Sequence, residues 1–545
     1  MSTGLPIPSL TPLSPAQLRE RIASGAEFAL LDPREEGAFS ARHLFFACCL
    51  PLSRMELLLA TRLPRLNVPI TLVTEGAHDE ALAARAAAVL AGAGYTDLRV
   101  LSGGTDAWAA AGGEVFSGVN VPSKAFGEFV EHWHDTPRLP AAELARRVAA
   151  NEDLVILDSR PFDEFQSMSI PGGVDCPGAE LVYRVRQAAP DPTTTVVVNC
   201  AGRTRSIIGA QSLINAGIPN PVFALKDGTM GWKLAGLSLQ HGETAQVAAP
   251  DAAVLEAAMQ QAAAVASQCG VTSTTPAEVA AWRAESARTT FLLDVRTAAE
   301  YEAGHWPGAL HAPGGQLVQA TDEYVMIRQA RLVLCDSEDG VRATMTAHWL
   351  LQLGWPDVRV LTDQPEVAQI GSGVSLVTLP SGVDELAPQA LATLLTGPAA
   401  STAQVLDFST SRQYKRAHLP GAMWATRARL AECVTQARAS RQGITAWVVM
   451  AGNQNMARLA AADLLALDPG GVVHLATAEQ AAWAQAGLAP TDAEPQWLSK
   501  VDDLWPKPTE GTVDARAAMQ QYLDWEVGLV GQVEREGLAR FRRLM

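Results

Sequence analysis

A cysteine followed by two arginines in a short loop is the clearest candidate for chemistry in this sequence. Cys200 follows the apolar, β-branched run 196–198 after one intervening residue, and Arg203 and Arg205 come soon after it. The thiolate is the nucleophilic form of cysteine, and neighbouring positive charge favours it over the thiol. We therefore expect Cys200 to be a nucleophile beside a site that binds anions.

The segments on either side of Cys200 predict a strand, a tight loop and a helix, in that order. Residues 196–198 are typical of a strand buried on both faces, and an apolar-periodic helix is expected from Ser206 to about Ala216. Backbone N–H groups in such a loop, together with the helix dipole, favour an anion and the thiolate. The residues expected to contact the substrate are Ala201, Gly202, Arg203, Thr204, Arg205 and Ser206.

The segment around Cys200 belongs to a unit that occurs four times along the chain. An apolar strand ends in an aspartate in each copy, and in three copies an arginine stands two residues later. These aspartates are Asp32, Asp158, Asp294 and Asp407. A second apolar strand ends 41 to 43 residues further on, at Glu75, Cys200, Cys335 and Met450. Such constant spacing predicts four tandem copies.

Strands that alternate with helical segments predict an α/β fold in each copy. The expected architecture is a doubly wound parallel sheet flanked by helices, with ligands bound at the carboxyl ends of the strands. The position of Cys200 at a strand end agrees with that rule. An amphipathic helix is expected in the tail, where Tyr522, Trp525, Leu529 and Phe541 can dock on the rest of the protein.

Taken together, the strand-Asp-x-Arg pattern, a following Pro-Gly and the cysteine loop before a helix resemble the rhodanese domain. The pattern Cys-x4-Arg, from Cys200 to Arg205, is similar to the active loop of the rhodanese sulfurtransferases. The related phosphatases and arsenate reductases use Cys-x5-Arg, and the residue at that place here is Ser206. The chain thus resembles a multi-domain rhodanese with four tandem domains over nearly the whole length to about residue 490.

The resemblance implies a thiosulfate sulfurtransferase-type enzyme. The Cys200 thiolate would take the outer sulfur of a donor such as thiosulfate, hold it as a persulfide and pass it to cyanide or a thiol. This ping-pong chemistry needs no organic cofactor and no metal. Asp158 and Arg160 recur in copies without the nucleophile, so we expect them to support the structure. Two other readings stay open, a non-catalytic sulfur carrier or partner-binding scaffold and, with less support, a phosphatase or arsenate reductase.

The repeats predict five parts of the chain. These are domain 1 at 1–118, inactive with Glu75 at the cysteine position; domain 2 with its linker at 119–245, active through Cys200; domain 3 with a helical linker at 246–378; domain 4 at 379–490, inactive with Met450 at the cysteine position; and a helical tail at 491–545. Cys335 is expected to be weak or inactive, because the carboxylates of Asp336, Glu338 and Asp339 disfavour a thiolate.

Composition limits the other function classes. The formal net charge of −16 disfavours nucleic acid or an anionic membrane as a partner. No apolar run has the length of a bilayer span, and the N-terminus lacks the pattern of a signal peptide. Seven cysteines without metal-site spacing favour reduced thiols in a cytoplasmic protein. The resemblance to the rhodanese family implies a small sulfane donor and a thiophilic acceptor as partners.

Overall fold

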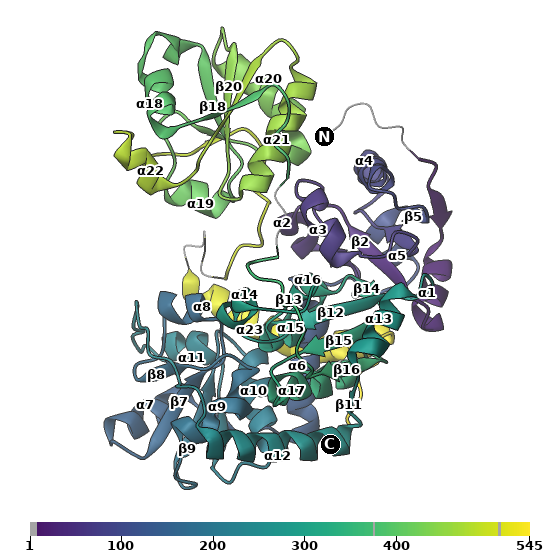
Figure 1. The fold of residues 1–545 in the computed structure, drawn as a ribbon, viewed down its shortest axis with the longest axis vertical. Coiled ribbons are helices and arrows are strands. Elements are labelled where there is room, and N and C mark those ends of the chain that lie inside the picture. The colour runs from purple at the N-terminus through teal and green to yellow at the C-terminus, as the bar shows by residue number, and fades with distance from the viewer. Residues whose placement is uncertain (1–7, 374–376, 509, 511–513) are drawn as a thin grey trace.

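The strands form four separate sheets in the computed structural model, which describes residues 8–373, 377–508, 510 and 514–545 (Figure 1). We call the sheet-bearing units repeats one to four, in chain order. The predicted first domain begins at residue 1, and residues 1–7 lie outside the described part. Among the described strands, all pair in parallel within these sheets except one short strand of repeat three, so the predicted α/β class is confirmed.

Repeat one has the sheet order β1-β5-β4-β2, with β3 also paired to β2. Its strands are β1 (Thr11–Leu13), β2 (Phe28–Asp32), β3 (Cys48–Cys49), β4 (Ile70–Leu72) and β5 (Leu98–Leu101). Its helices are α1 (Pro15–Ser24), α2 (Glu36–Ala41), α3 (Met55–Arg62), α4 (Glu80–Gly92) and α5 (Gly104–Ala110).

Repeat two has the sheet order β6-β10-β9-β7-β8 and contains Cys200. Its strands are β6 (Arg138–Leu139), β7 (Leu154–Asp158), β8 (Gly173–Asp175), β9 (Thr195–Asn199) and β10 (Val222–Leu225). Its helices are α6 (Val121–His134), α7 (Ala141–Ala149), α8 (Phe162–Ser167), α9 (Glu180–Ala188), α10 (Thr204–Asn215) and α11 (Gly228–Leu234).

Repeat three follows the same order, β11-β16-β15-β12-β13. Its strands are β11 (Thr272–Ser273), β12 (Thr290–Asp294), β13 (Leu310–His311), β14 (Ile327–Arg328), β15 (Arg331–Cys335) and β16 (Val358–Leu361). Its helices are α12 (Ala252–Cys269), α13 (Pro276–Ala284), α14 (Ala298–Ala303), α15 (Gly314–Gln319), α16 (Thr321–Tyr324) and α17 (Val341–Gln352).

Repeat four has the order β17-β21-β20-β18-β19-β22. Its strands are β17 (Val383–Leu386), β18 (Ala403–Asp407), β19 (Met423–Trp424), β20 (Ala446–Met450), β21 (Val472–Ala476) and β22 (Gln496–Trp497). Its helices are α18 (Pro388–Thr396), α19 (Ser411–Arg416), α20 (Leu430–Ser440), α21 (Gln454–Leu467) and α22 (Gln480–Gln485). The strand β22 lies within the range 491–545 that was predicted as helical tail.

The repeats pack against one another and share structural elements. Strand β14 of repeat three pairs antiparallel with β2 of repeat one, and one hydrophobic core contains side chains of both repeats. The long helix α12 packs against α9 of repeat two and α17 of repeat three. The tail helix α23 (Ala515–Glu536) packs against α6, and Figure 1 shows repeat four at one end of the molecule. Among the described helices, none has the length and apolarity to span a membrane.

The strand-Asp-x-Arg pattern forms the same set of hydrogen bonds in three repeats. In repeat two, Arg160 donates two hydrogen bonds to Asp158, at 2.8 and 2.7 Å, and a third to the Met168 carbonyl at 2.6 Å. Arg34 with Asp32 and Arg296 with Asp294 make the same bidentate pair and also bond a carbonyl eight residues downstream. These buried pairs fasten the strand end to the next loop, as expected of a structural role.

Candidate active site

Cys200 stands between β9 and α10, at the carboxyl end of the second sheet. The helix begins at Thr204, two residues before the predicted start. The carbonyl oxygens of Cys200 and Ala201 accept hydrogen bonds from the N–H groups of Thr229 and Met230, at 2.9 and 3.1 Å. The first turn of α11 therefore binds the carbonyl oxygens of the cysteine loop.

Gly228 makes this close packing possible. Its φ is +54°, and a Cβ built there would lie 2.3 Å from the Cys200 carbonyl oxygen. Only glycine combines a positive φ with so close an approach to a neighbouring backbone. The sequence pattern Gly-x3-Trp, which begins at Gly228, thus marks the support of the cysteine loop.

The Cys200 thiol is buried and surrounded by polar groups of its own loop. Its Sγ lies 3.5 Å from the Ser206 hydroxyl. Burial raises the pKa of Cys200 above the ordinary thiol value, whereas Arg205, Ser206 and the N–H of Gly202 act in the opposite direction. The expected loop contacts are present, but in the protein without substrate they do not outweigh burial. Burial thus opposes the thiolate, whereas Arg205 and the loop hydrogen bonds favour it.

Arg205 is the cation that acts on the sulfur. Both Nη atoms donate to Glu164 of α8, at 2.9 and 2.8 Å, and Nη1 also reaches the Gln316 side chain of repeat three at 3.3 Å. Gln316 lines a cavity of about 540 Å³ between repeats two and three, which is also lined by Ser159. The guanidinium thus acts on Cys200 and also contacts a residue of repeat three that lines this cavity.

Arg203 has a different environment from the one predicted. Its guanidinium donates to Glu128 of α6 at 2.7 and 2.8 Å, to Glu131, and to Asp227 at 3.1 Å. Only 6% of the side chain is exposed. Three carboxylates saturate this guanidinium, so its geometry is that of a clamp between the loop and α6. The sequence gives no local signal for this, since the partners lie on another element.

The comparisons with known proteins identify the family. The model of the Rhodanese-like domain matches residues 14–111, 140–235 and 275–363. The chain belongs to the rhodanese-like family. The crystal structure of a thiosulfate sulfurtransferase from Pseudomonas aeruginosa is 47% identical, with a TM-score of 0.89, and the match covers 98% of this chain and 99% of that one. The resemblance seen in the sequence is thus confirmed.

One curated relative matches a smaller part. An HTH-type transcriptional regulator from Mycobacterium tuberculosis is 35% identical over 101 residues, which is 18% of this chain. The chain spans 43% of the length of that relative.

The register of the rhodanese-like sheets corrects the predicted cysteine positions in the other repeats. Asp158 is the Cα partner of Asn199 in repeat two, whereas Asp294 is the partner of Cys335 and Asp407 is the partner of Met450. Cys335 and Met450 therefore correspond to Asn199. The residues that follow them, Asp336 and Ala451, stand at the position of Cys200.

Repeat one shows the same one-residue difference. The N–H groups of Thr105 and Asp106 donate to the carbonyls of Thr74 and Glu75, as Thr229 and Met230 do to Cys200 and Ala201. Thr74 thus stands at the cysteine position and Glu75 at the next one. The sequence prediction aligned the repeats by the last residue of each apolar run. The last residue of that run is not the same as the last residue paired in the sheet, so the alignment is one residue off. Among the described repeats, only repeat two has a cysteine at this position.

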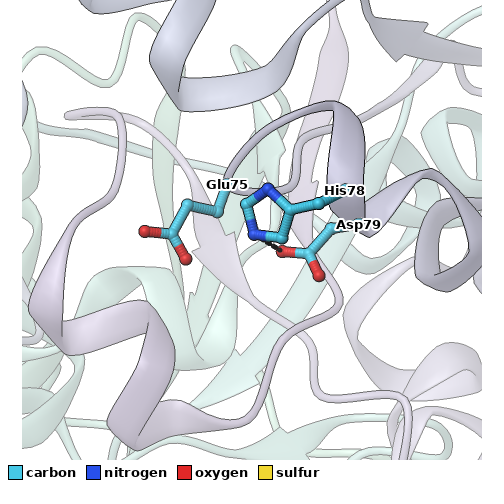
Figure 2. A group of neighbouring side chains, drawn as sticks. All are labelled: Glu75, His78 and Asp79. Carbon is cyan, nitrogen blue, oxygen red and sulfur yellow. Dashed lines mark ion pairs between the residues drawn. The ribbon is translucent and has the colours of Figure 1, made fainter.

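The loop of repeat one is filled by charged side chains. Glu75, His78 and Asp79 lie together, and Figure 2 shows the ion pair between His78 and Asp79, at 3.6 Å. Arg34 and Arg42 approach the Glu75 carboxylate within 3.7 and 3.5 Å. We interpret the group as an ion-pair network that occupies the place of an active loop.

The loop of repeat three is closed in a similar way. Asp336 is buried and accepts hydrogen bonds from Arg342 at 3.0 Å and from the N–H of Ala343 at 2.8 Å. Burial, followed by Asp294, raises the pKa of Cys335 well above the ordinary value. Of the three acids expected to act on this thiol, Asp336 is among the groups that raise its pKa, whereas the Glu338 side chain is exposed.

These environments predict an order of alkylation. In single-cysteine variants, iodoacetamide should modify Cys200 with a rate that rises toward alkaline pH, because burial raises its pKa and the thiolate reacts. Cys335 should have a higher midpoint, because Asp294 and Asp336 add to the effect of burial, which Arg296 only partly offsets. The rates are measured by mass spectrometry over a pH series. A Cys335 midpoint at or below that of Cys200 would contradict this prediction.

Proposed function

We propose that this protein is a sulfurtransferase that moves a sulfane sulfur from a donor such as thiosulfate to cyanide or a thiol, through a persulfide on Cys200. The observation that carries the proposal is the position of Cys200 at the carboxyl end of β9, with Arg205 and loop N–H groups acting on its sulfur. The similarity to a thiosulfate sulfurtransferase over nearly the whole chain supports it. We place the single competent site in repeat two, within residues 119–245.

Two displacements account for the reaction. The Cys200 thiolate attacks the outer sulfur of thiosulfate, the bond to the sulfonate sulfur breaks, and its electron pair leaves with sulfite. Cyanide then attacks the outer sulfur of the persulfide, thiocyanate forms, and the electron pair of the broken S–S bond returns to Cys200. Hydrogen bonds from Gly202 and Ser206 stabilise both anionic forms of the cysteine. Asp158 and Arg160 support the loop from the neighbouring strand.

The amount of thiocyanate formed per chain tests the proposed function directly. Thiosulfate and cyanide should yield many equivalents of thiocyanate per chain. One equivalent and no more would instead favour a sulfur carrier. Hydrolysis of a phosphate ester in place of thiocyanate formation would favour the phosphatase reading. All seven cysteines are free, which supports our proposal of a reducing compartment such as the cytoplasm.

Arg205 is the residue we assign to the sulfonate oxygens of the donor. Charge-assisted hydrogen bonds contribute roughly 1.5–3 kcal/mol, so Arg205→Ala should lower kcat/KM for thiosulfate by about one to two decades. The variant also loses a cation that lowers the pKa of Cys200, and that effect acts on every donor. An organic persulfide, which has no sulfonate, should therefore lose less. Steady-state kinetics with both donors test this, and equal losses would contradict the assignment.

A further inference from the structure

The tail helix lies directly on the cysteine loop. A Cβ built on Gly202 would lie 3.3 Å from Glu526 Oε2 and 3.4 Å from Tyr522 Cε1. Both side chains belong to α23, which comes from the far end of the chain (Figure 1). The absence of a side chain at Gly202 thus lets a carboxyl group of the tail reach the backbone of the loop. Burial raises the pKa of the Tyr522 hydroxyl, Glu526 adds to this effect, and Cys200 is close enough to add to it as well.

Glu526 is buried, and its two oxygens have different environments. Oε1 accepts a hydrogen bond from the Tyr522 hydroxyl at 2.9 Å. Oε2 has no hydrogen-bond partner among the described residues, although Glu526 is only 2% exposed. A buried polar atom without a partner is unfavourable, and a group bound beside it would supply the missing hydrogen bond. The unpartnered oxygen is the one that lies beside Gly202.

The aromatic side chains of the tail hold the nearest cation away from Glu526 Oε2. Lys124 Nζ donates to the Val119 carbonyl at 2.7 Å and lies 4.6 to 5.7 Å from the ring centres of Trp505, Trp525 and Tyr522. Cation–π contacts of this kind hold an ammonium group without a carboxylate partner. Lys124 therefore gives Glu526 an attractive charge without a hydrogen bond or ion pair between the two described side chains.

Burial brings the ionisation of the Glu526 carboxyl close to neutral pH. Burial raises its pKa to about 7. Lys124 and Glu128 face it from α6, where the first lowers and the second raises the pKa; Arg203 of the loop and Tyr522 of α23 lower it. Below this pKa, Oε2 can carry a proton and act as a hydrogen-bond donor. Above it, the carboxylate repels an anion that enters the loop.

We propose that Glu526 is a catalytic residue of the sulfur-transfer site, where its protonated carboxyl donates a hydrogen bond to the anionic donor bound over the Cys200 loop. This rests on the function proposed above. As the S–S bond of thiosulfate breaks, negative charge moves onto the departing sulfite, and a neutral acid stabilises that charge. The proton stays on Glu526, and the electron pair of the broken bond leaves with sulfite. The tail helix is thereby part of the site, together with repeat two.

The test compares Glu526→Gln and Glu526→Ala with wild type and with Asp524→Asn, an exposed acid on the same helix as control. kcat/KM for thiosulfate is measured from pH 5.5 to 9, and folding is checked by circular dichroism. Ionisation of Cys200 should raise kcat/KM with pH in every variant. In wild type and the control, ionisation of Glu526 should lower kcat/KM again at higher pH. Glu526→Gln keeps a neutral donor and should lose this decline. Glu526→Ala should be about ten- to a hundred-fold slower at pH 6.

An unchanged alkaline decline in Glu526→Gln would overturn the inference, and so would wild-type activity of folded Glu526→Ala at pH 6. If Glu526→Ala does not fold, the pH profile of Glu526→Gln decides alone. Sulfur loading of Cys200 by thiosulfate, measured by intact mass in wild type, separates this inference from the proposed function. If wild type takes up no sulfur, the proposed function is wrong. If wild type takes up sulfur and the Glu526 variants keep wild-type kinetics, only the role of Glu526 is wrong.

Discussion

Cys200→Ser is expected to reduce thiocyanate formation to the rate without enzyme. A serine hydroxyl cannot form a persulfide, and its proton is held much more tightly than that of a thiol. The substitution is nearly isosteric, so the fold and the binding of thiosulfate should persist. Thiocyanate is measured with saturating thiosulfate and cyanide, and the thermal midpoint is recorded to show that the variant is folded.

Cys335→Ala is the matched control for this experiment. Cys335 corresponds in register to Asn199 and lies within a buried core, so its removal should leave turnover by Cys200 intact. Turnover that survives in Cys200→Ser but disappears in Cys335→Ala would move the active site to repeat three. That outcome would contradict the assignment of repeat two.

Arg203→Ala is expected to cause the largest loss of stability. The substitution leaves Glu128 and Glu131 without the guanidinium that neutralises them in a buried site. Removal of one partner of a buried pair costs about 3–5 kcal/mol. The affected contacts join α6 to the cysteine loop. The midpoint of the unfolding transition that includes repeat two should therefore decrease. Urea or thermal unfolding, followed by circular dichroism, measures the change.

The pH dependence of this loss has a definite sign. Burial already raises the pKa of Glu128, and without Arg203 it must rise further. A carboxyl whose pKa is raised in the folded state destabilises the fold as pH increases through that pKa. The deficit of Arg203→Ala should therefore shrink at pH 5 and grow at pH 8. Arg146→Ala, which breaks an exposed pair with Glu143, should change stability by less than about 1 kcal/mol at either pH. Equal effects of both variants would contradict the clamp.

The parts of the site that follow from local patterns could be predicted from the sequence. The β-branched run before Cys200 is a buried strand because parallel strands covered on both faces need apolar residues throughout. The Asp-x-Arg pairs form between residues two apart, so their recurrence was visible. The amphipathic tail was also visible, and Tyr522 and Trp525 do contact Lys124 of α6.

The parts that depend on contacts across the chain could not be predicted. The position of Arg203 depends on carboxylates of α6, and the role proposed for Glu526 depends on where α23 lies; neither element is adjacent to the loop in sequence. The pairing of β14 with β2 likewise joins residues about 300 apart. The one-residue error at Cys335 arose because apolar character ends at a different place from hydrogen-bonded pairing.

Intact-mass spectrometry after treatment with thiosulfate tests the central claim most directly. Wild-type protein, freed of excess donor, should gain the mass of one sulfur atom, and peptide mapping should place it on the peptide that contains Cys200. Cyanide should remove it again with release of thiocyanate. A protein that gains no mass, or that carries the sulfur on another cysteine, would contradict a persulfide on Cys200 as the carrier of the transferred sulfur.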